Sequence, residues 1–177
     1  MLGLGSSITT KSGVYTTGGG GGGAVTYIAA NTFSLSEDNS TGSVLSVVSS
    51  QADDNYVTKT DVVKIVAGRD LTSSDNVAAV TSSGISDLTD GSTVNITFSV
   101  YYPSANTGDS TSSASLGYVG GSSNASKLTG ANSNLGEWNT FTGTVTVGSS
   151  NNNLTVFVDD AGAGAMKNND EFYLAEV

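Results

Sequence analysis

The sequence contains no cysteine, no histidine and a single proline, Pro103. The absence of cysteine excludes disulfide bonds, and the absence of both residue types excludes thiolate and imidazole ligands for a metal. We therefore expect packing alone to hold the 177 residues together, with no cofactor.

Basic residues are also scarce, with six Lys and Arg against sixteen Asp and Glu. The formal net charge of -10 repels phosphate backbones, which proteins bind by placing Lys and Arg against them. This balance argues against nucleic acid as a partner.

Long apolar runs are missing as well. No stretch approaches the roughly eighteen apolar residues of a membrane span. The N-terminus lacks the positive charges and the apolar run of an export signal. We therefore expect no membrane partner and a protein made in the cytoplasm, leaving the cell only inside something larger.

What the sequence does contain is typical of an all-β protein. Ser, Thr, Asn and Gly punctuate short runs of Val, Ile, Thr, Tyr and Phe, and no amphipathic helix stands out. The length suits one domain, which buries about 70% of the surface of the unfolded chain. About ten short strands at this spacing predict a two-sheet antiparallel β-sandwich, or jelly roll.

The clearest strand is TVNITFSVYY, residues 93–102, which alternates with period two. One face carries five apolar side chains, Val94, Ile96, Phe98, Val100 and Tyr102. The other face is more polar and ends at Tyr101. Residues 140–147 repeat the pattern, with Phe141, Val145 and Val147 inward and four threonines outward, and residues 154–158 repeat it again. Weaker strands are expected at 24–30, 43–49, 55–58, 62–67, 76–80, 115–119 and 171–177.

The N-terminal 23 residues look different from the rest, because a short apolar tip and a polar spacer precede a run of glycines. Such a run has no preferred backbone conformation and is costly to order. We predict an anchoring arm over residues 1–23 and a β-sandwich domain over residues 24–177, with a disordered terminus as the alternative. The tip residues are Met1, Leu2, Leu4 and Ile8, and the hinge residues are Gly18, Gly19, Gly20, Gly21, Gly22 and Gly23.

The second half of the chain resembles carbohydrate-binding modules of the family 4/9/22 type. The resemblance rests on DGSTVNITFSVYY, GEWNTFTGTVTV, NNNLTVFVDD and NNDEFYLAEV, and covers roughly residues 87–177. It implies a jelly roll and a glycan ligand. The structural calcium site of those modules is not expected here, because Ala175 and Glu176 stand where they usually carry paired aspartates.

The opening MLGLGSSI resembles the start of small structural proteins of tailed bacteriophages, which place such a tip ahead of a β-sandwich. This resemblance implies a virion component that is assembled in the host cytoplasm and released by lysis. Its partners would be the major capsid protein or neighbouring copies of itself.

Two aromatic residues are candidates for a contact surface. Tyr101 is expected to project from the polar face of its strand, where it would be either a subunit contact or a platform for stacking a sugar ring. Trp138, in GEWNTF, is expected to be core, with a sugar platform as the alternative.

The carboxylates suggest little catalysis. Asp159 and Asp160 lie in a glycine-rich turn, where we expect them to cap backbone amides, with a Ca²⁺ site as the alternative. No acid sits within an apolar strand where burial would raise its pKa for acid catalysis. Without histidine or cysteine, a serine nucleophile would need a lysine base. We therefore expect no enzymatic activity and no catalytic residues.

These observations favour a non-enzymatic virion protein, most simply a capsid decoration or cement protein docked through its arm. The alternative is a glycan-binding module on a head or tail appendage, which would hold the host surface.

Overall fold

The computed structural model describes residues 27–72, 75–82, 85, 88–108, 114–120, 128–131, 135–149, 152–160 and 166–177, with the backbone alone at 114–118, 128–131 and 157–160. The arm and the glycine hinge lie outside these residues, so the boundary between arm and sandwich stays a prediction.

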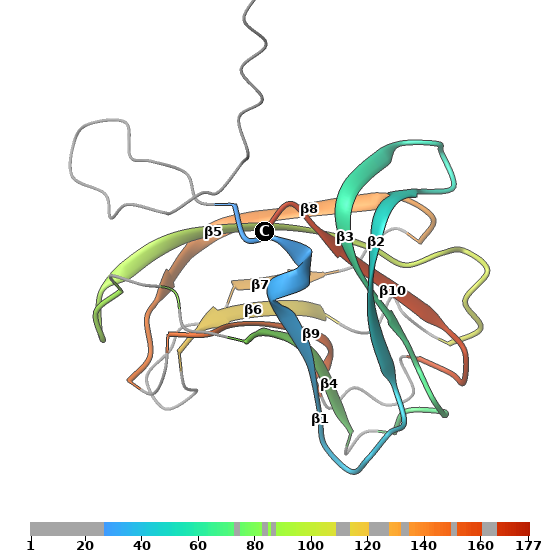
Figure 1. The fold of residues 1–177 in the computed structure, drawn as a ribbon, viewed down its shortest axis with the longest axis horizontal. Helices are drawn as coiled ribbons and strands as arrows, with labels where there is room; N and C mark the ends of the chain where they lie inside the picture. The colour runs from blue at the N-terminus through green and yellow to red at the C-terminus, as the bar shows by residue number, and fades with distance from the viewer. Residues whose placement is uncertain are drawn as a thin grey trace, which may run out of the picture.

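The described residues form two antiparallel five-stranded sheets packed face to face, as predicted (Figure 1). The first sheet has the order β1-β4-β9-β6-β7 and the second the order β2-β3-β10-β5-β8. The strands are β1 Phe33–Glu37, β2 Val44–Ala52, β3 Thr58–Val66, β4 Asn76–Thr81, β5 Thr93–Tyr101, β6 Ala114–Val119, β7 Leu128–Ala131, β8 Trp138–Thr146, β9 Leu154–Asp160 and β10 Glu171–Ala175.

The period-two pattern of residues 93–102 is confirmed. Its five apolar side chains all belong to the core between the sheets, and Phe98, Val100 and Tyr102 are completely buried. β5 pairs with β8 over nine consecutive residues, from Thr93 opposite Thr146 to Tyr101 opposite Trp138. Val145 and Val147 are also fully buried, and Phe141 packs against the core from its margin.

Two of the weaker strands were predicted in the wrong place. The described part of 24–30 is not a strand: a 3-10 turn at Ala30–Thr32 precedes β1, which begins at Phe33. Residues 55–57 form the turn between β2 and β3 instead of a strand. β1 and the four-residue β7 lie in segments rich in turn-forming residues, so their strand pattern is too short to stand out.

The ends of the sandwich domain lie side by side, because the N–H of Ile28 donates a 2.7 Å hydrogen bond to the carbonyl of Val177. Figure 1 shows the C-terminus beside the point where the first described residues enter the fold. None of the described segments is a helix of the length and apolarity needed to cross a membrane.

One loop crossing depends on a glycine. A Cβ at Gly68 would lie 2.1 Å from the carbonyl oxygen of Gly42, and Gly42 itself has a φ of +71°. The two loops approach so closely that only a residue without a side chain fits at Gly68.

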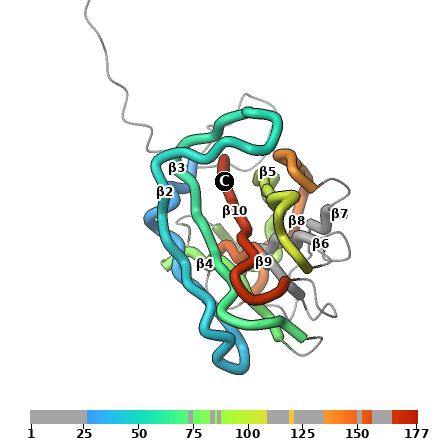
Figure 2. Tube along the Cα trace, turned by 90° about the vertical axis from the view of Figure 1, so that its right-hand side faces the viewer, coloured from blue at the N-terminus to red at the C-terminus, as the bar shows by residue number. Residues whose placement is uncertain are grey.

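The β2–β3 hairpin does not stay in the plane of its sheet. Its turn rises beyond the second sheet and bends over the outer face toward β5 (Figures 1 and 2). This bend brings the hairpin tip onto side chains of β5 and β8 and builds the site described next.

Candidate functional site

The tip of the β2–β3 hairpin is organised by one buried carboxylate, Asp53, which is 6% exposed. Its Oδ1 accepts hydrogen bonds from the N–H groups of Asn55 at 2.9 Å and Val57 at 2.8 Å. Its Oδ2 accepts one from the N–H of Trp138, at the start of β8, at 3.1 Å. Asp53 therefore shapes the turn and fastens it to β8.

A second carboxylate, Asp54, fixes the same turn to β5 and the loop after it. Oδ1 accepts the Tyr101 hydroxyl at 2.6 Å, and Oδ2 accepts the N–H of Ser104 at 3.0 Å. Hydrogen bonds from the Ser104 side chain, then from Tyr101 and then from the Ser104 N–H, hold the pKa of Asp54 below its usual value. The N–H of Asp54 also donates to the carbonyl of Gly136 at 2.9 Å.

The fixed turn presents two apolar side chains to solvent. Tyr56 is 89% exposed and Val57 is 53% exposed. Tyr56 has a φ of +66°, in the left-handed region that bulky residues rarely adopt. Such strained residues persist only where the surroundings determine them, and they cluster at functional sites. The hairpin tip thus holds an aromatic ring outward at a cost to the backbone.

An aromatic cluster supports the tip from below, on the outer face of the second sheet. The rings of Tyr101 and Tyr173 stack with centroids 5.4 Å apart, and Trp138 lies 5.4 Å from Tyr101 at a tilt of 45°. Val62 and Ala175 complete its buried part, and Val48 packs against it. The Trp138 indole N–H donates to the carbonyl of Val57 at 3.1 Å.

The expectation of an exposed Tyr101 is therefore wrong. Its side chain does lie on the outer face of β5, as the alternation predicts, but it is only 3% exposed because the hairpin and the neighbouring rings cover it. It cannot serve as an open platform. Trp138 is partly buried and belongs to this outer cluster, not to the core between the sheets.

Two lysines flank the aromatic cluster. The Lys59 ammonium lies 5.7 Å from the centroid of the Trp138 ring and pairs with Glu176. The Lys64 ammonium lies 5.5 Å from the Tyr173 ring and 2.5 Å from Glu171. Burial, followed by hydrogen bonds to carboxylates, raises the pKa of both Tyr101 and Tyr173 well above the usual value, so both are neutral phenols.

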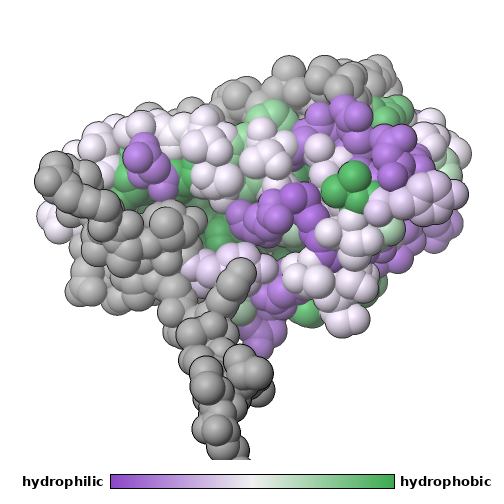
Figure 3. Space-filling model, turned by 90° about the horizontal axis from the view of Figure 1, so that it is seen from above, coloured by the Kyte–Doolittle hydropathy of each residue, from purple (hydrophilic) through white to green (hydrophobic). Residues whose placement is uncertain are grey.

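The rest of this face carries small polar side chains. Thr97 bonds Thr142 at 3.0 Å, Ser99 bonds Thr140 at 2.7 Å, and Thr144 donates to Asn95 at 2.6 Å. Figure 3 looks down on this side of the molecule, where residues of intermediate hydropathy cover much of the coloured surface and hydrophilic and hydrophobic residues show as separate patches.

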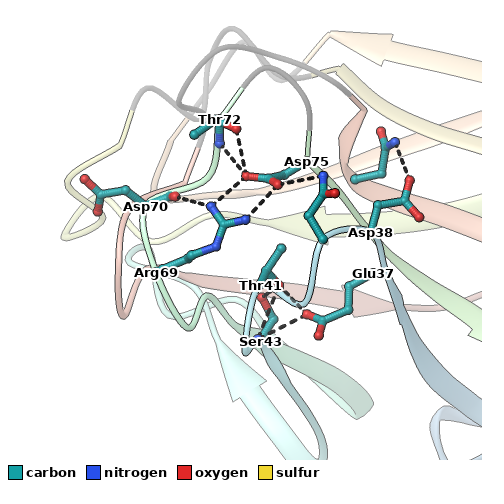
Figure 4. Close-up of polar contacts among 10 residues, drawn as sticks. Glu37, Asp38, Thr41, Ser43, Arg69, Asp70, Thr72 and Asp75 are labelled. Atoms are coloured by element: carbon teal, nitrogen blue, oxygen red, sulfur yellow. Dashed lines mark hydrogen bonds and ion pairs between the residues drawn. The ribbon is translucent and has the colours of Figure 1, made fainter.

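A second polar cluster, at the other end of β2, is structural (Figure 4). Arg69 donates to both oxygens of the buried Asp75 at 2.8 Å, and Thr72 donates to the same carboxylate through its N–H and its hydroxyl. Glu37 accepts the hydroxyl of Thr41 and the N–H of Ser43. The side-chain amide of Asn39 donates to Asp75 at 3.2 Å and joins the loop before β2 to the loop before β4. These bonds give Asp75 and Glu37 partners within the protein.

A third buried carboxylate, Asp170, is also fully occupied. Its oxygens accept the N–H groups of Thr107, Gly108 and Lys167 at 2.8 Å each. Within the described ranges, no group of three or more acidic side chains is arranged to hold a metal ion. The expected glycine-rich turn at Asp159 and Asp160 is wrong, because both residues end β9 and pair with Val77 and Asn76 of β4. Their side chains lie outside the described residues, so the Ca²⁺ alternative stays untested. Met1, Leu2, Leu4, Ile8 and Gly18 to Gly23 also lie outside the described residues, and the predictions about them stay untested.

Sequence reasoning missed Tyr56. The signal was its position in DDNY, an aromatic residue inside a cluster of turn-forming residues between two apolar runs. Interpreting residues 55–58 as a strand obscured that signal.

Comparison with known proteins adds little to this picture. No family model matches the chain, and no curated protein does. Among solved structures, one match comes from a study of the promiscuous specificity of carbohydrate-binding modules from the β-sandwich superfamily. The match has a TM-score of 0.44 and 14% identity, and covers 82% of this chain and 55% of that one. The chain thus spans about half the length of the structure it matches.

Proposed function

We propose that this chain is a non-catalytic binding module that holds a neutral glycan against the tip of its β2–β3 hairpin. The observation that carries the proposal is the exposed Tyr56 ring, held in a left-handed backbone on a turn fixed by Asp53 and Asp54.

The chemistry of the tip suits a sugar ring. A pyranose presents an apolar face that stacks on an aromatic ring, and hydroxyls at its rim that need hydrogen-bond partners. At the tip, Val57 extends the apolar surface of Tyr56, and the exposed Asn55 lies next to them in the turn. The fixed turn also reduces the entropy lost on binding, since the ring is already held in place.

The charge of the chain favours a neutral ligand. A net charge of -10 repels sulfated, phosphorylated and uronic acid polymers. A polymer of neutral hexoses or amino sugars meets no such barrier.

The described carboxylates support binding without catalysis. Glycoside hydrolysis needs a pair of acids placed on either side of a bond. The buried acids Asp53, Asp75 and Asp170 are each tied to several N–H donors of the protein, which leaves them shaping loops.

The test is affinity electrophoresis through gels that contain one neutral polysaccharide each, with Tyr56→Asn as the informative variant. Asparagine tolerates a left-handed φ, so the turn is kept while the ring is lost. We expect wild type to be retarded by at least one polysaccharide and Tyr56→Asn to bind it about tenfold more weakly.

Val44→Ser is the matched control, because Val44 is also an exposed apolar residue, 60% exposed, but lies at the opposite end of β2. It should bind like wild type, and all three proteins should melt cooperatively. Equal retardation of wild type and Tyr56→Asn, or no retardation of wild type in any gel, would overturn the proposal.

The virion role remains a separate proposal, supported by the resemblance of MLGLGSSI to phage structural proteins and by the composition of the predicted arm, and by no described residue. Deleting residues 1–23 should leave a folded protein that no longer enters particles. If the truncated chain fails to fold, the arm is part of the sandwich core and not a tether.

A further inference from the structure

β8 forms the border of the second sheet. It pairs with β5 over nine consecutive residues without a register shift, and no described strand follows it on the other side (Figure 1). A border strand offers backbone N–H and C=O groups to another strand. Proteins usually guard such borders with charges, proline or bulges, and the β8 sequence WNTFTGTVT contains no charged residue and no proline.

The other borders are less suited to pairing. β1 has five residues and ends in Glu37, and β7 has four. β2 is as long as β8, but opposite its middle Asp61 has a φ of +55°, and its far end bends over the sheet. β8 is therefore the long, regular border of the described sandwich.

The sequence of β8 is nearly a palindrome. Residues 140–146 read T-F-T-G-T-V-T and are symmetric about Gly143 except that Phe141 is matched by Val145. An antiparallel pair of identical strands has a two-fold axis, so residue i faces residue j and residue j faces residue i. A palindromic strand is the pattern that suits such a pair.

We propose that two copies of this chain pair through β8, antiparallel and with the two-fold axis at Gly143, to join their second sheets into one sheet of ten strands. This inference is independent of the proposed glycan function. In this register Thr142 faces Thr144 of the other copy, and Phe141 faces Val145.

Both faces of the new pair are complementary. On the outer face, hydroxyl pairs across β5 and β8 such as Thr97–Thr142 would continue into a threonine row of the other copy, and such cross-strand pairs stabilise sheets. On the inner face, Phe141 is only partly buried at the margin of the core. A second β8 would cover its ring with a β-branched side chain, a favourable cross-strand combination.

Net charge sets the condition for pairing. Each copy carries -10, whereas β8 itself is uncharged, so the repulsion comes from the rest of the surface and is screened by salt. We expect the dimer fraction to rise with ionic strength.

Because the chain has no cysteine, introduced thiols report the register without ambiguity. Thr142→Cys mixed with Thr144→Cys should form a disulfide-linked dimer under mild oxidation, visible on a non-reducing gel. Either variant alone should form about tenfold less, since its two thiols would be diagonal neighbours, beyond the reach of a disulfide. Equal cross-linking in the mixture and in the single variants would overturn the register.

Light scattering after size exclusion tests the pairing itself. At about 0.5 M salt, the wild type should have a mass of twice 17.7 kDa. Thr142→Lys with Thr144→Lys places like charges opposite each other and should reduce the mass to one chain. Mixing it with Thr142→Glu plus Thr144→Glu should restore the dimer.

Val44→Lys is the control, since it places the same charge on an exposed residue of the opposite border strand, β2, and should leave the dimer intact. Circular dichroism checks that each variant is folded. A monomeric wild type, or a dimer abolished by Val44→Lys and unaffected by the β8 lysines, would overturn the proposal.

Discussion

The Tyr101 hydroxyl donates a 2.6 Å hydrogen bond to Asp54, which lies 47 residues earlier in the chain. The bond ties the end of β5 to the hairpin that covers it. Tyr101 is consequently an interior residue of a second, smaller cluster, although it lies on the outer face of its sheet.

Substitutions at Tyr101 should therefore affect stability strongly. Tyr101→Phe removes one hydrogen bond and should lower the free energy of unfolding by about 1 kcal/mol. Tyr101→Ala also leaves a cavity between Tyr173 and Trp138 and should cost about 3 kcal/mol or more. Urea unfolding measures both. A loss below about 1 kcal/mol in the alanine variant would mean that the aromatic cluster is not packed.

Asp53→Ala should destabilise the protein and loosen the hairpin tip. It removes the acceptor of three N–H donors, from Asn55, Val57 and Trp138, and a hydrogen bond to a charged group contributes about 1.5–3 kcal/mol. Hydrogen exchange should become faster at Asn55 and Val57. Exchange as slow as in wild type would show that the turn does not depend on this carboxylate.

Stability should fall as the solution becomes acidic. Hydrogen bonds from Arg69, then from the Thr72 N–H, hold the pKa of Asp75 well below its usual value. The folded state therefore binds this proton less readily than the unfolded state. The resulting stability is present above about pH 5 and is lost progressively as pH falls toward the lowered pKa. In melting experiments between pH 7 and pH 3, Asp75→Asn should show a weaker pH dependence than wild type.

Gly68→Ala should be among the most damaging small substitutions. The added methyl group would lie 2.1 Å from the Gly42 carbonyl oxygen, so one of two backbones must move. Gly91→Ala is a useful comparison, because a Cβ there meets no atom within 4 Å and the variant bears only the strain of a φ of +77°. Thermal melting should rank wild type above Gly91→Ala and Gly91→Ala above Gly68→Ala.

Thermal melting should not respond to EDTA or to millimolar Ca²⁺. Glu176 is paired with Lys59, and among the described residues no group of three or more acidic side chains is arranged to hold a metal ion. A melting temperature that rises with Ca²⁺ concentration, as expected for a ligand of the folded state, would instead favour a site at Asp159 and Asp160.

The sandwich was predictable from the sequence because its strands alternate in polarity. The alternate residues Val94, Ile96, Phe98, Val100 and Tyr102 enter the core as their spacing indicates. Val63 and Ile65 likewise face the core while Lys64 faces outward. Such a pattern arises because one face of each strand is buried against the opposing sheet while the other face is not.

The site was not predictable in the same way. Whether Tyr101 is exposed depends on a hairpin from another part of the chain that bends over its face, and strand alternation contains no information about that bend. The exposure of Tyr56 could not be predicted either, because it depends on a hydrogen bond between Asp53 and Trp138 of β8, 85 residues away. Both are consequences of long-range contacts.

At position 56, the stability of the fold and the presence of an exposed aromatic ring favour different residues. Glycine or asparagine would relieve the φ of +66°, a gain of about 1 kcal/mol, while removing the ring. In a laboratory evolution experiment selected by temperature alone, we expect tyrosine to disappear early from position 56. Under selection for capture on a surface it should persist. The residue found at position 56 after such an experiment therefore indicates whether selection acted on thermal stability or on surface binding.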